Sequence, residues 1–226
     1  MMMKRIIIFA FLLPVVLCGQ AQDRQALRDS LAAATDALAY HPDSVDLRLK
    51  KAAWNVELEQ WQYAKDDYDR VLRKEPDNIA ALYYRAFVNE KLGRYNFARL
   101  DYQNLIRLVP GNFEIQLGYA LLNQKDRHYT EAMDQMNLLL SQFPDSALAY
   151  AVRAGMEVER GQYELASYDY EEAILRDSTN TDYILSHADV LITLGRKEKA
   201  RKQLDRLVAL GVPRGSLNDY YKRLNK

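Results

Sequence analysis

The side chains that could carry out acid–base or metal chemistry are scattered along the chain. The three histidines, His41, His128 and His187, lie far apart, and none belongs to a His-Glu-x-x-His motif, which places two zinc ligands on one helix face. Neighbouring carboxylates such as Asp66 and Asp67 would point in different directions from a helix, so they cannot serve one substrate as an acid and a base. No glycine-rich phosphate loop and no Gly-x-Ser-x-Gly nucleophile motif is present. We therefore expect no enzymatic activity, no metal and no cofactor.

The charge balance argues against nucleic acid as a partner. Lysine plus arginine and aspartate plus glutamate each number 31 among 226 residues, so the field that would attract the chain to a polyanion is missing. The basic stretch at 196–202 is typical of a solvated helix face. The only cysteine, Cys18, lies near the N-terminus, which leaves the rest of the chain without a disulfide or a thiolate ligand.

The first 21 residues have the pattern of a signal peptide. Lys4 and Arg5 precede an apolar run at 6–17, which is shorter than the roughly 20 residues that cross a bilayer as a helix. Small residues at Gly19 and Ala21 fit cleavage after Ala21. We therefore expect export, with residues 22–226 as a periplasmic or secreted mature protein.

A second processing route would use Cys18 as the lipid-bearing first residue of a lipoprotein. Sequences of that kind usually carry Gly, Ala or Ser immediately before the cysteine, and Leu17 departs from this pattern. Cleavage after Ala21 is therefore the favoured route, and a lipid anchor at Cys18 is the alternative. Only the anchored form would have a membrane as a partner.

A strict internal repeat organises the rest of the chain. Prolines recur every 34 residues, at Pro42, Pro76, Pro110 and Pro144. With these prolines at repeat position 32, five repeats cover 45–78, 79–112, 113–146, 147–180 and 181–214. Positions 8 and 20 are alanine in every repeat: Ala52, Ala86, Ala120, Ala154 and Ala188, then Ala64, Ala98, Ala132, Ala166 and Ala200. Because alanine lets two helices cross closely, each repeat is predicted to be a helix hairpin.

Two further columns complete the pattern. Position 17 is aromatic in four repeats, at Trp61, Tyr95, Tyr129 and Tyr163, and position 15 is glycine in three, at Gly93, Gly161 and Gly195. With these columns the chain resembles the tetratricopeptide-repeat (TPR) family, and 92–110 (LGRYNFARLDYQNLIRLVP) is close to the family pattern as it stands. The resemblance implies an all-α fold, a right-handed superhelix of helix hairpins that forms one solenoid over 22–226. Segments 23–40 and 216–225 are predicted to be terminal capping helices, the second N-capped by Ser216.

Polar residues occupy most copies of positions 7 and 11, where the family usually carries apolar and aromatic side chains; Leu191 is the exception at position 11. Position 23 is aspartate in the three repeats where position 7 is Lys or Arg, and glutamine in the other two. Because positions 7 and 11 share a face with the alanine at position 8, their side chains should be partly buried and need partners. The matching predicts three ion pairs: Lys51 with Asp67, Arg85 with Asp101, and Arg153 with Asp169. Independent solvation of each charge is the alternative.

Positions 5 and 9 lie one helical turn apart on the first helix of each repeat, the helix that lines the concave face in the TPR family. At the centre of the solenoid these positions hold Tyr83, Phe87, Leu117 and Leu121, which are predicted to anchor an apolar side of a partner protein or peptide. The predicted polar rim consists of Glu90, Lys91, Glu114, Gln124 and Lys125. The expected function is that of a non-catalytic exported adaptor or scaffold. A lipid-anchored accessory subunit of an envelope assembly or secretion complex is the alternative.

The alanine columns generate a test of the hairpin interpretation. Replacing Ala132 with leucine should overpack the helix crossing and lower the free energy of unfolding by about 1 to 3 kcal/mol. Chemical denaturation of the variant and the parent measures this difference. An unchanged free energy would argue against a close crossing at position 20.

Overall fold

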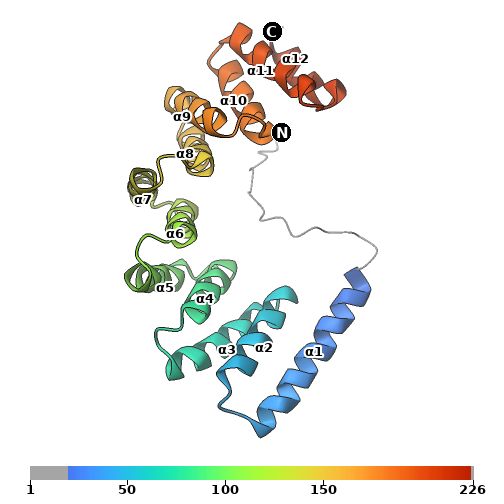
Figure 1. Cartoon of the computed structure of the whole chain (residues 1–226), viewed down its shortest axis with the longest axis vertical. Helices are drawn as coiled ribbons and strands as arrows, with labels where there is room; N and C mark the ends of the chain where they lie inside the picture. Colours follow the sequence, from blue (N-terminus) through green and yellow to red (C-terminus); the bar gives the residue numbers. More distant parts are fainter. Residues whose placement is uncertain (1–19, 225–226) are drawn as a thin grey trace. The chain divides into compact units, whose positions relative to one another are not determined.

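The computed structural model describes residues 20–224, which form two compact units that meet between Leu92 and Gly93. The first unit contains α1 (Gln20–Tyr40), α2 (Val45–Glu57), α3 (Trp61–Lys74) and α4 (Ile79–Lys91). The second contains α5 (Tyr95–Leu108), α6 (Phe113–Lys125), α7 (Tyr129–Gln142), α8 (Ala147–Glu159), α9 (Tyr163–Arg176), α10 (Thr181–Thr193), α11 (Lys197–Ala209), the 3-10 helix η1 (Arg214–Leu217) and α12 (Asn218–Leu224). Within each unit, consecutive helices pack against one another (Figure 1).

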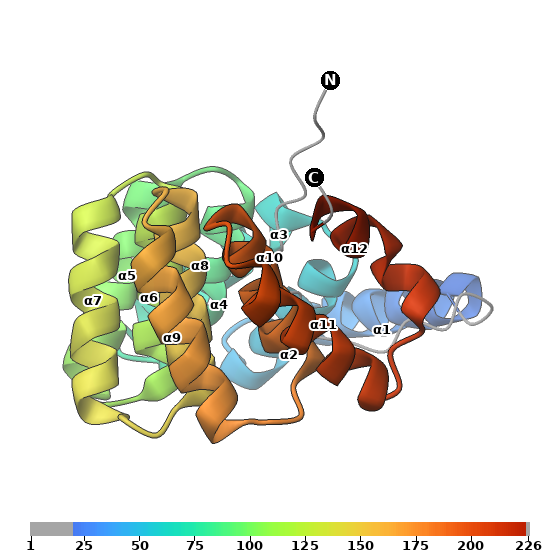
Figure 2. The same ribbon diagram turned by 90° about the horizontal axis from the view of Figure 1, so that it is seen from above.

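The described residues 20–224 contain helices and turns but no strand, as predicted. The first helices of the repeats, α2, α4, α6, α8 and α10, all begin at repeat position 1, and the preceding helices end two residues before the position 32 column. Figure 2 shows the second unit from another side, with α8 and α9 side by side as in Figure 1. Whether the two units join into one solenoid over 22–226 stays a prediction.

Each first helix begins with the same side-chain cap. The residue immediately before each first helix is serine or asparagine, and its side-chain oxygen accepts a hydrogen bond from a backbone N–H in the first helical turn. These N-caps are Ser44, Asn78, Asn112, Ser146 and Asn180. The bond satisfies one of the free N–H groups at the helix start, so the sequence fixes where every hairpin begins.

The turn inside each hairpin requires a left-handed backbone at repeat position 15. Gly93, Gly161 and Gly195 have φ of 70°, 72° and 71°, which glycine adopts without strain. Glu59 and Arg127 hold the same position with φ of 58° and 62°. A side chain is disfavoured in this conformation, so the turns of the first and third repeats carry a conformational cost that the other three avoid.

The alanines at positions 8 and 20 are almost completely shielded from solvent. Four hairpins lie within a single unit: α2 with α3, α6 with α7, α8 with α9, and α10 with α11. Their alanines at positions 8 and 20 are 0% exposed, except for Ala132 at 1%. With only a methyl group at each crossing, the two helices approach closely and bury the larger side chains on either side of the contact.

A contact between a glycine and a tyrosine ring also joins one hairpin to the next. Gly118 on α6 faces the ring of Tyr102 on α5, and a Cβ atom at Gly118 would lie 2.7 Å from the Tyr102 hydroxyl oxygen. Tyr102 is 5% exposed, so its ring has little room to move aside. Gly118 is therefore required by packing and not by backbone conformation.

The ends of the described chain differ in detail from the prediction. Helix α1 begins at Gln20, three residues before the predicted start at 23. At the other end, Ser216 is not an N-cap, because it lies inside η1 and its hydroxyl donates to the Pro213 carbonyl at 2.7 Å. Helix α12 then begins at Asn218. No helix of the described part has the length and apolar character needed to span a bilayer.

The turn geometry predicts a gain in stability. Replacing Arg127 with glycine should raise the free energy of unfolding by about 0.5 to 1 kcal/mol, because glycine relieves the positive φ at this turn. Denaturant unfolding of the variant provides the measurement. The reverse change at the equivalent turn, Gly161→Ala, is the control and should destabilise, and a loss of stability on Arg127→Gly would contradict the argument.

Candidate functional site

The two predicted anchors of the first unit, Tyr83 and Phe87, lie one turn apart on α4 and are both half-buried. Phe87 meets Trp61 of α3 edge to face, with ring centroids 6.0 Å apart. The ammonium nitrogen of Lys91, one turn further along α4, lies 5.1 Å from the Phe87 centroid and 6.0 Å from the Trp61 centroid. Trp61, Phe87 and Lys91 therefore form an aromatic–cation cluster, in which the two rings attract the charged amine.

Tyr83 belongs to a neighbouring row of tyrosines. Its ring stands edge to face with Tyr84 at 5.5 Å, and Tyr84 stacks on the buried ring of Tyr68 at 6.1 Å. Tyr84 is 45% exposed, so the row runs from the core of the unit to its surface. Rings held in this way lose little conformational freedom on binding, which is the property expected of an anchor.

The two predicted anchors of the second unit differ from one another. Leu121 on α6 is 39% exposed, whereas Leu117, one turn earlier, is 6% exposed and packs in an apolar cluster with Ala132, Met136 and Leu140. Leu121 is thus accessible to a partner, and Leu117 supports the surface from below.

The predicted rim residues lie mostly at the surface. Glu114, Lys91 and Lys125 are exposed, and Glu90 is half-buried. The Gln124 amide is half-buried and donates to Glu159 Oε2 at 2.8 Å. Because Tyr83 and Phe87 belong to the first unit and Leu117 and Leu121 to the second, one continuous patch across the four stays a prediction.

The ion pairs predicted inside the first and fourth repeats are confirmed. Lys51 Nζ lies 2.6 Å from Asp67 Oδ2, and the Arg153 guanidinium donates to both carboxylate oxygens of Asp169 at 2.6 and 2.8 Å. Both aspartates are almost fully buried, at 2% and 1% exposure. Position 23 therefore supplies a buried anion that the cation at position 7 neutralises.

The third predicted pair, Arg85 with Asp101, would join the two units and stays a prediction. Within the first unit, Arg85 donates to Asp69 at 2.7 Å. Asp69 occupies position 25 of the preceding repeat, a column that the sequence prediction did not consider.

Position 25 of each of the five full repeats contacts the residue at position 7 of the unit that follows it. The two positions are always 16 residues apart, and the contacting pairs are Asp69 with Arg85, Gln103 with Tyr119, Asn137 with Arg153, Glu171 with His187, and Asp205 with Tyr221. The position 7 side chain thus joins one hairpin to the next. The signal for this contact is the polar character of all five residues at position 25.

Glu157 on α8 is the most strongly perturbed carboxyl group of the second unit. It is 4% exposed, and burial together with the nearby Asp169 carboxylate raises its pKa to about 7. Its Oε2 atom has no hydrogen-bond partner among the described residues. The same repeat position is asparagine in the first three repeats, at Asn55, Asn89 and Asn123. An ionisable group therefore stands where the first three repeats carry the amide of asparagine.

Residues 20–224 contain no group of three or more histidine, cysteine or carboxylate side chains arranged to hold a metal ion. No protein-family model matches the sequence, and no curated protein matches it. Solved structures do match its fold.

A TPR protein from Parabacteroides merdae has a TM-score of 0.63 and 23% identity, over 92% of this chain and 82% of that one. MamA from Desulfovibrio magneticus RS-1 has a TM-score of 0.65 and 16% identity, over 75% of this chain and 96% of its own. The chain has a TPR fold. YrrB, described as a TPR protein with an unusual peptide-binding site, has a TM-score of 0.58 and 15% identity, over 79% of this chain and 92% of its own. At these identities the likeness concerns the fold alone.

The raised pKa of Glu157 predicts a pH dependence of stability. The folded state holds this proton up to about pH 7, whereas an unfolded glutamate releases it near its ordinary value of 4.5. Folding therefore binds a proton between these values, and this group's contribution to stability falls as the pH rises through that window.

Replacing Glu157 with glutamine should remove this slope. Between pH 5 and pH 8 the parent should lose about 1 to 3 kcal/mol relative to the variant, measured by denaturant unfolding across the range. The matched control is Glu114→Gln, because Glu114 is exposed on α6 and should leave the slope unchanged. Parallel curves for the parent and the Glu157 variant would contradict a buried, protonated Glu157.

Proposed function

We propose that this chain is a non-catalytic adaptor that holds a segment of a partner protein against the first helices of its repeats. The observation that supports this most directly is the aromatic–cation cluster of Trp61, Phe87 and Lys91, with Tyr83 one turn away. Aromatic side chains that are half-buried and fixed by their neighbours are the usual source of binding energy at protein interfaces.

The cluster also indicates what the partner segment should offer. Its rings present apolar area, and the Lys91 amine adds a positive charge beside them. A segment with an aliphatic or aromatic side chain next to a carboxylate would satisfy both features. YrrB, which shares the fold, is described as having a peptide-binding site, and this supports a peptide or protein as the ligand of the present chain.

The absence of an enzymatic activity is part of the same proposal. Glu157 and His187 have perturbed pKa values and are buried, and the hydroxyl that His187 contacts, Ser167 Oγ, belongs to a residue that is only 2% exposed, so it is not presented to a substrate. Their contacts have a structural explanation in the polar columns of the repeats. We therefore assign them to the architecture and not to catalysis.

We further propose that the chain is exported. The proposed signal peptide at 1–21, including Cys18, lies outside the described residues except at its last two positions, so this proposal depends on the sequence pattern. Intact-mass analysis of the protein from the envelope fraction distinguishes the two processing routes. A mature N-terminus at Gln22 supports the free adaptor, whereas an acylated Cys18 supports an anchored accessory subunit of an envelope assembly or secretion complex.

The groove proposal predicts which substitutions weaken binding. Affinity pull-down with mass spectrometry identifies a partner, and calorimetry then compares variants against it. Tyr83→Ala and Phe87→Ala should each weaken binding by about 1 kcal/mol or more while leaving the helical content unchanged. Phe97→Ala is the control, because Phe97 is 59% exposed on α5, the second helix of its hairpin. If the two α4 variants stay folded and bind like the parent, the partner uses another surface.

A further inference from the structure

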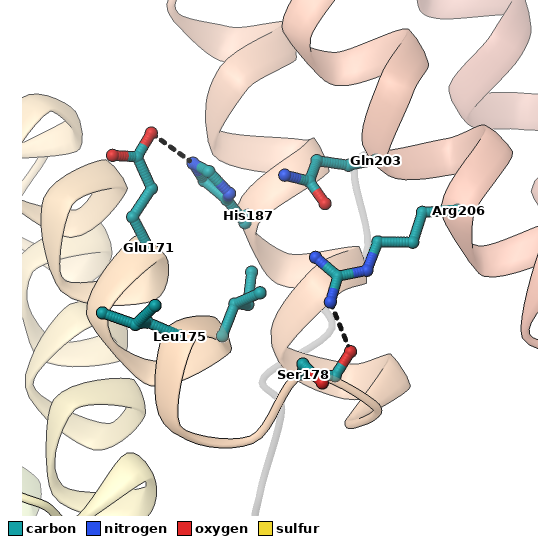
Figure 3. Close-up of a pocket in the computed structure, with 7 residues that line it drawn as sticks. Glu171, Leu175, Ser178, His187, Gln203 and Arg206 are labelled. Atoms are coloured by element: carbon teal, nitrogen blue, oxygen red, sulfur yellow. Dashed lines mark hydrogen bonds and ion pairs between the residues drawn. The ribbon is translucent and has the colours of Figure 1, made fainter.

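A cavity of about 300 Å³ lies where α9 meets the hairpin of α10 and α11, all within the second unit (Figure 3). Its wall includes Glu171 and Leu175 of α9, Ser178 of the following turn, His187 of α10, and Gln203 and Arg206 of α11. Leu175 is 76% exposed and the Glu171 side chain 51%, so the rim on the α9 side is open to solvent.

Two polar atoms of this wall lack a partner among the described residues: His187 Nδ1 and Gln203 Oε1. His187 is 1% exposed, and its Nε2 atom lies 3.1 Å from Ser167 Oγ and 3.7 Å from Glu171 Oε1. Burial, reinforced by Lys199 and Arg196, lowers the pKa of His187 to about 4, so the ring is neutral at physiological pH. A buried polar atom without a partner is costly, which makes this the incomplete part of the hairpin.

The fourth repeat shows what completes the same position. There the side chain at position 7 is Arg153, whose guanidinium donates to Asp169 at position 23 and to Asn137 at position 25 of the repeat before. In the fifth repeat position 7 is His187, position 23 is Gln203 and position 25 is Glu171. Histidine is shorter than arginine and cannot fill the space, so the cavity occupies the place of a guanidinium.

The charges of these columns lead to the same conclusion. In the third repeat Tyr119 meets Gln103, and all three columns are neutral. In the fourth repeat Arg153 balances Asp169, with Asn137 neutral. In the fifth repeat position 25 is the acidic residue Glu171, whereas position 7 is the neutral His187 and position 23 is the amide Gln203. The acceptors for a cation are present there, and the cation at position 7 is missing.

We propose that this pocket binds the guanidinium of an arginine side chain presented by another molecule, in the place that Arg153 fills from within the fourth repeat. The guanidinium would donate to Gln203 Oε1 and to the Glu171 carboxylate, the counterparts of Asp169 and Asn137, and its aliphatic stem would lie along Leu175. This site is separate from the α4 surface of the proposed adaptor function and does not depend on it.

Arg206 places a positive charge in the same wall, and the fourth repeat shows that two guanidinium groups can lie close together where each is paired with a carboxylate. Arg206 donates to the Ser178 carbonyl, which holds its guanidinium at the lower side of the pocket as seen in Figure 3. In the fourth repeat Arg153 and Arg176 both lie over the ring of Tyr150, at 5.8 and 4.2 Å from its centroid. Two guanidinium groups therefore share one environment there, with Arg153 paired to Asp169 and Arg176 paired to Glu172.

The first test uses N-acetyl-arginine N-methylamide, a mimic of arginine within a chain, and NMR signals of the His187 ring and the Gln203 amide. We expect saturable shifts with a dissociation constant on the order of 1 mM, typical of a single small fragment. The citrulline analogue has the same shape without the charge and should bind at least tenfold more weakly. Free arginine, run in parallel, distinguishes a metabolite site from a site for an arginine within a protein, because only the latter favours the capped compound. Absence of shifts, or equal binding of the citrulline analogue, would overturn the proposal.

The second test fills the pocket from within. His187→Arg should restore the arrangement of the fourth repeat, raise Tm by about 2 to 4 °C and abolish binding of the probe. Glu171→Gln should weaken binding at least threefold, and it remains informative if His187→Arg does not fold. Glu198→Gln, an exposed site on α11, is the matched control and should bind like the parent. Undiminished binding by the Glu171 variant would refute a guanidinium site.

Discussion

The close crossing of the two helices in each hairpin is the constraint on which the other features depend. Methyl groups at positions 8 and 20 bring the helix axes together, and the alanines of the hairpins within each unit are at most 1% exposed. The residues next to these alanines are buried in the same helix–helix interface, and several of them are polar. Asp67 and Asp169 are buried for this reason, and a buried carboxylate needs a cation and hydrogen bonds. The close crossing therefore requires the buried polar side chains to be paired, and it determines which side chains are left to contact another molecule.

Several of these features could be predicted because the chain contains five copies of one repeat, and equivalent positions of the copies can be compared. The alanine columns predicted the hairpins, and the matching of positions 7 and 23 predicted the bonds of Lys51 to Asp67 and of Arg153 to Asp169. The cap column at position 34 and the polar column at position 25 carried signals of the same kind. Their contacts lie between repeats, because Asn137 and Asp69 each accept a hydrogen bond from the repeat that follows, and matching positions within one repeat does not reveal such contacts.

Other features could not be predicted from the pattern, because they depend on volumes and depths that residue types do not encode. Leu117 and Leu121 occupy equivalent sides of α6 in the sequence, yet one is packed under Met136 and the other is accessible. The raised pKa of Glu157 depends on how deeply α8 is buried against Asp169, and not on the presence of a glutamate. The Gly118 position likewise reflects the actual place of the Tyr102 ring.

Departures from the repeat pattern have consequences that depend on whether the neighbours compensate. Tyr119 replaces a cation in the third repeat, but glutamine stands at both partner columns, so no charge is left unbalanced. Glu157 replaces an amide in the fourth repeat, and the group compensates by keeping its proton, because burial favours the neutral form. In the fifth repeat the neutral His187 stands in place of arginine, position 25 holds Glu171, and the Gln203 Oε1 atom lacks a partner among the described residues. Neither a partner column nor a proton compensates for that change, and the missing volume remains open beside an exposed rim. A substitution of this kind leaves hydrogen-bond acceptors without a donor and an open space beside them. In a repeat protein such a position is recognised because the equivalent side chain of another repeat, here Arg153, pairs with the corresponding acceptors.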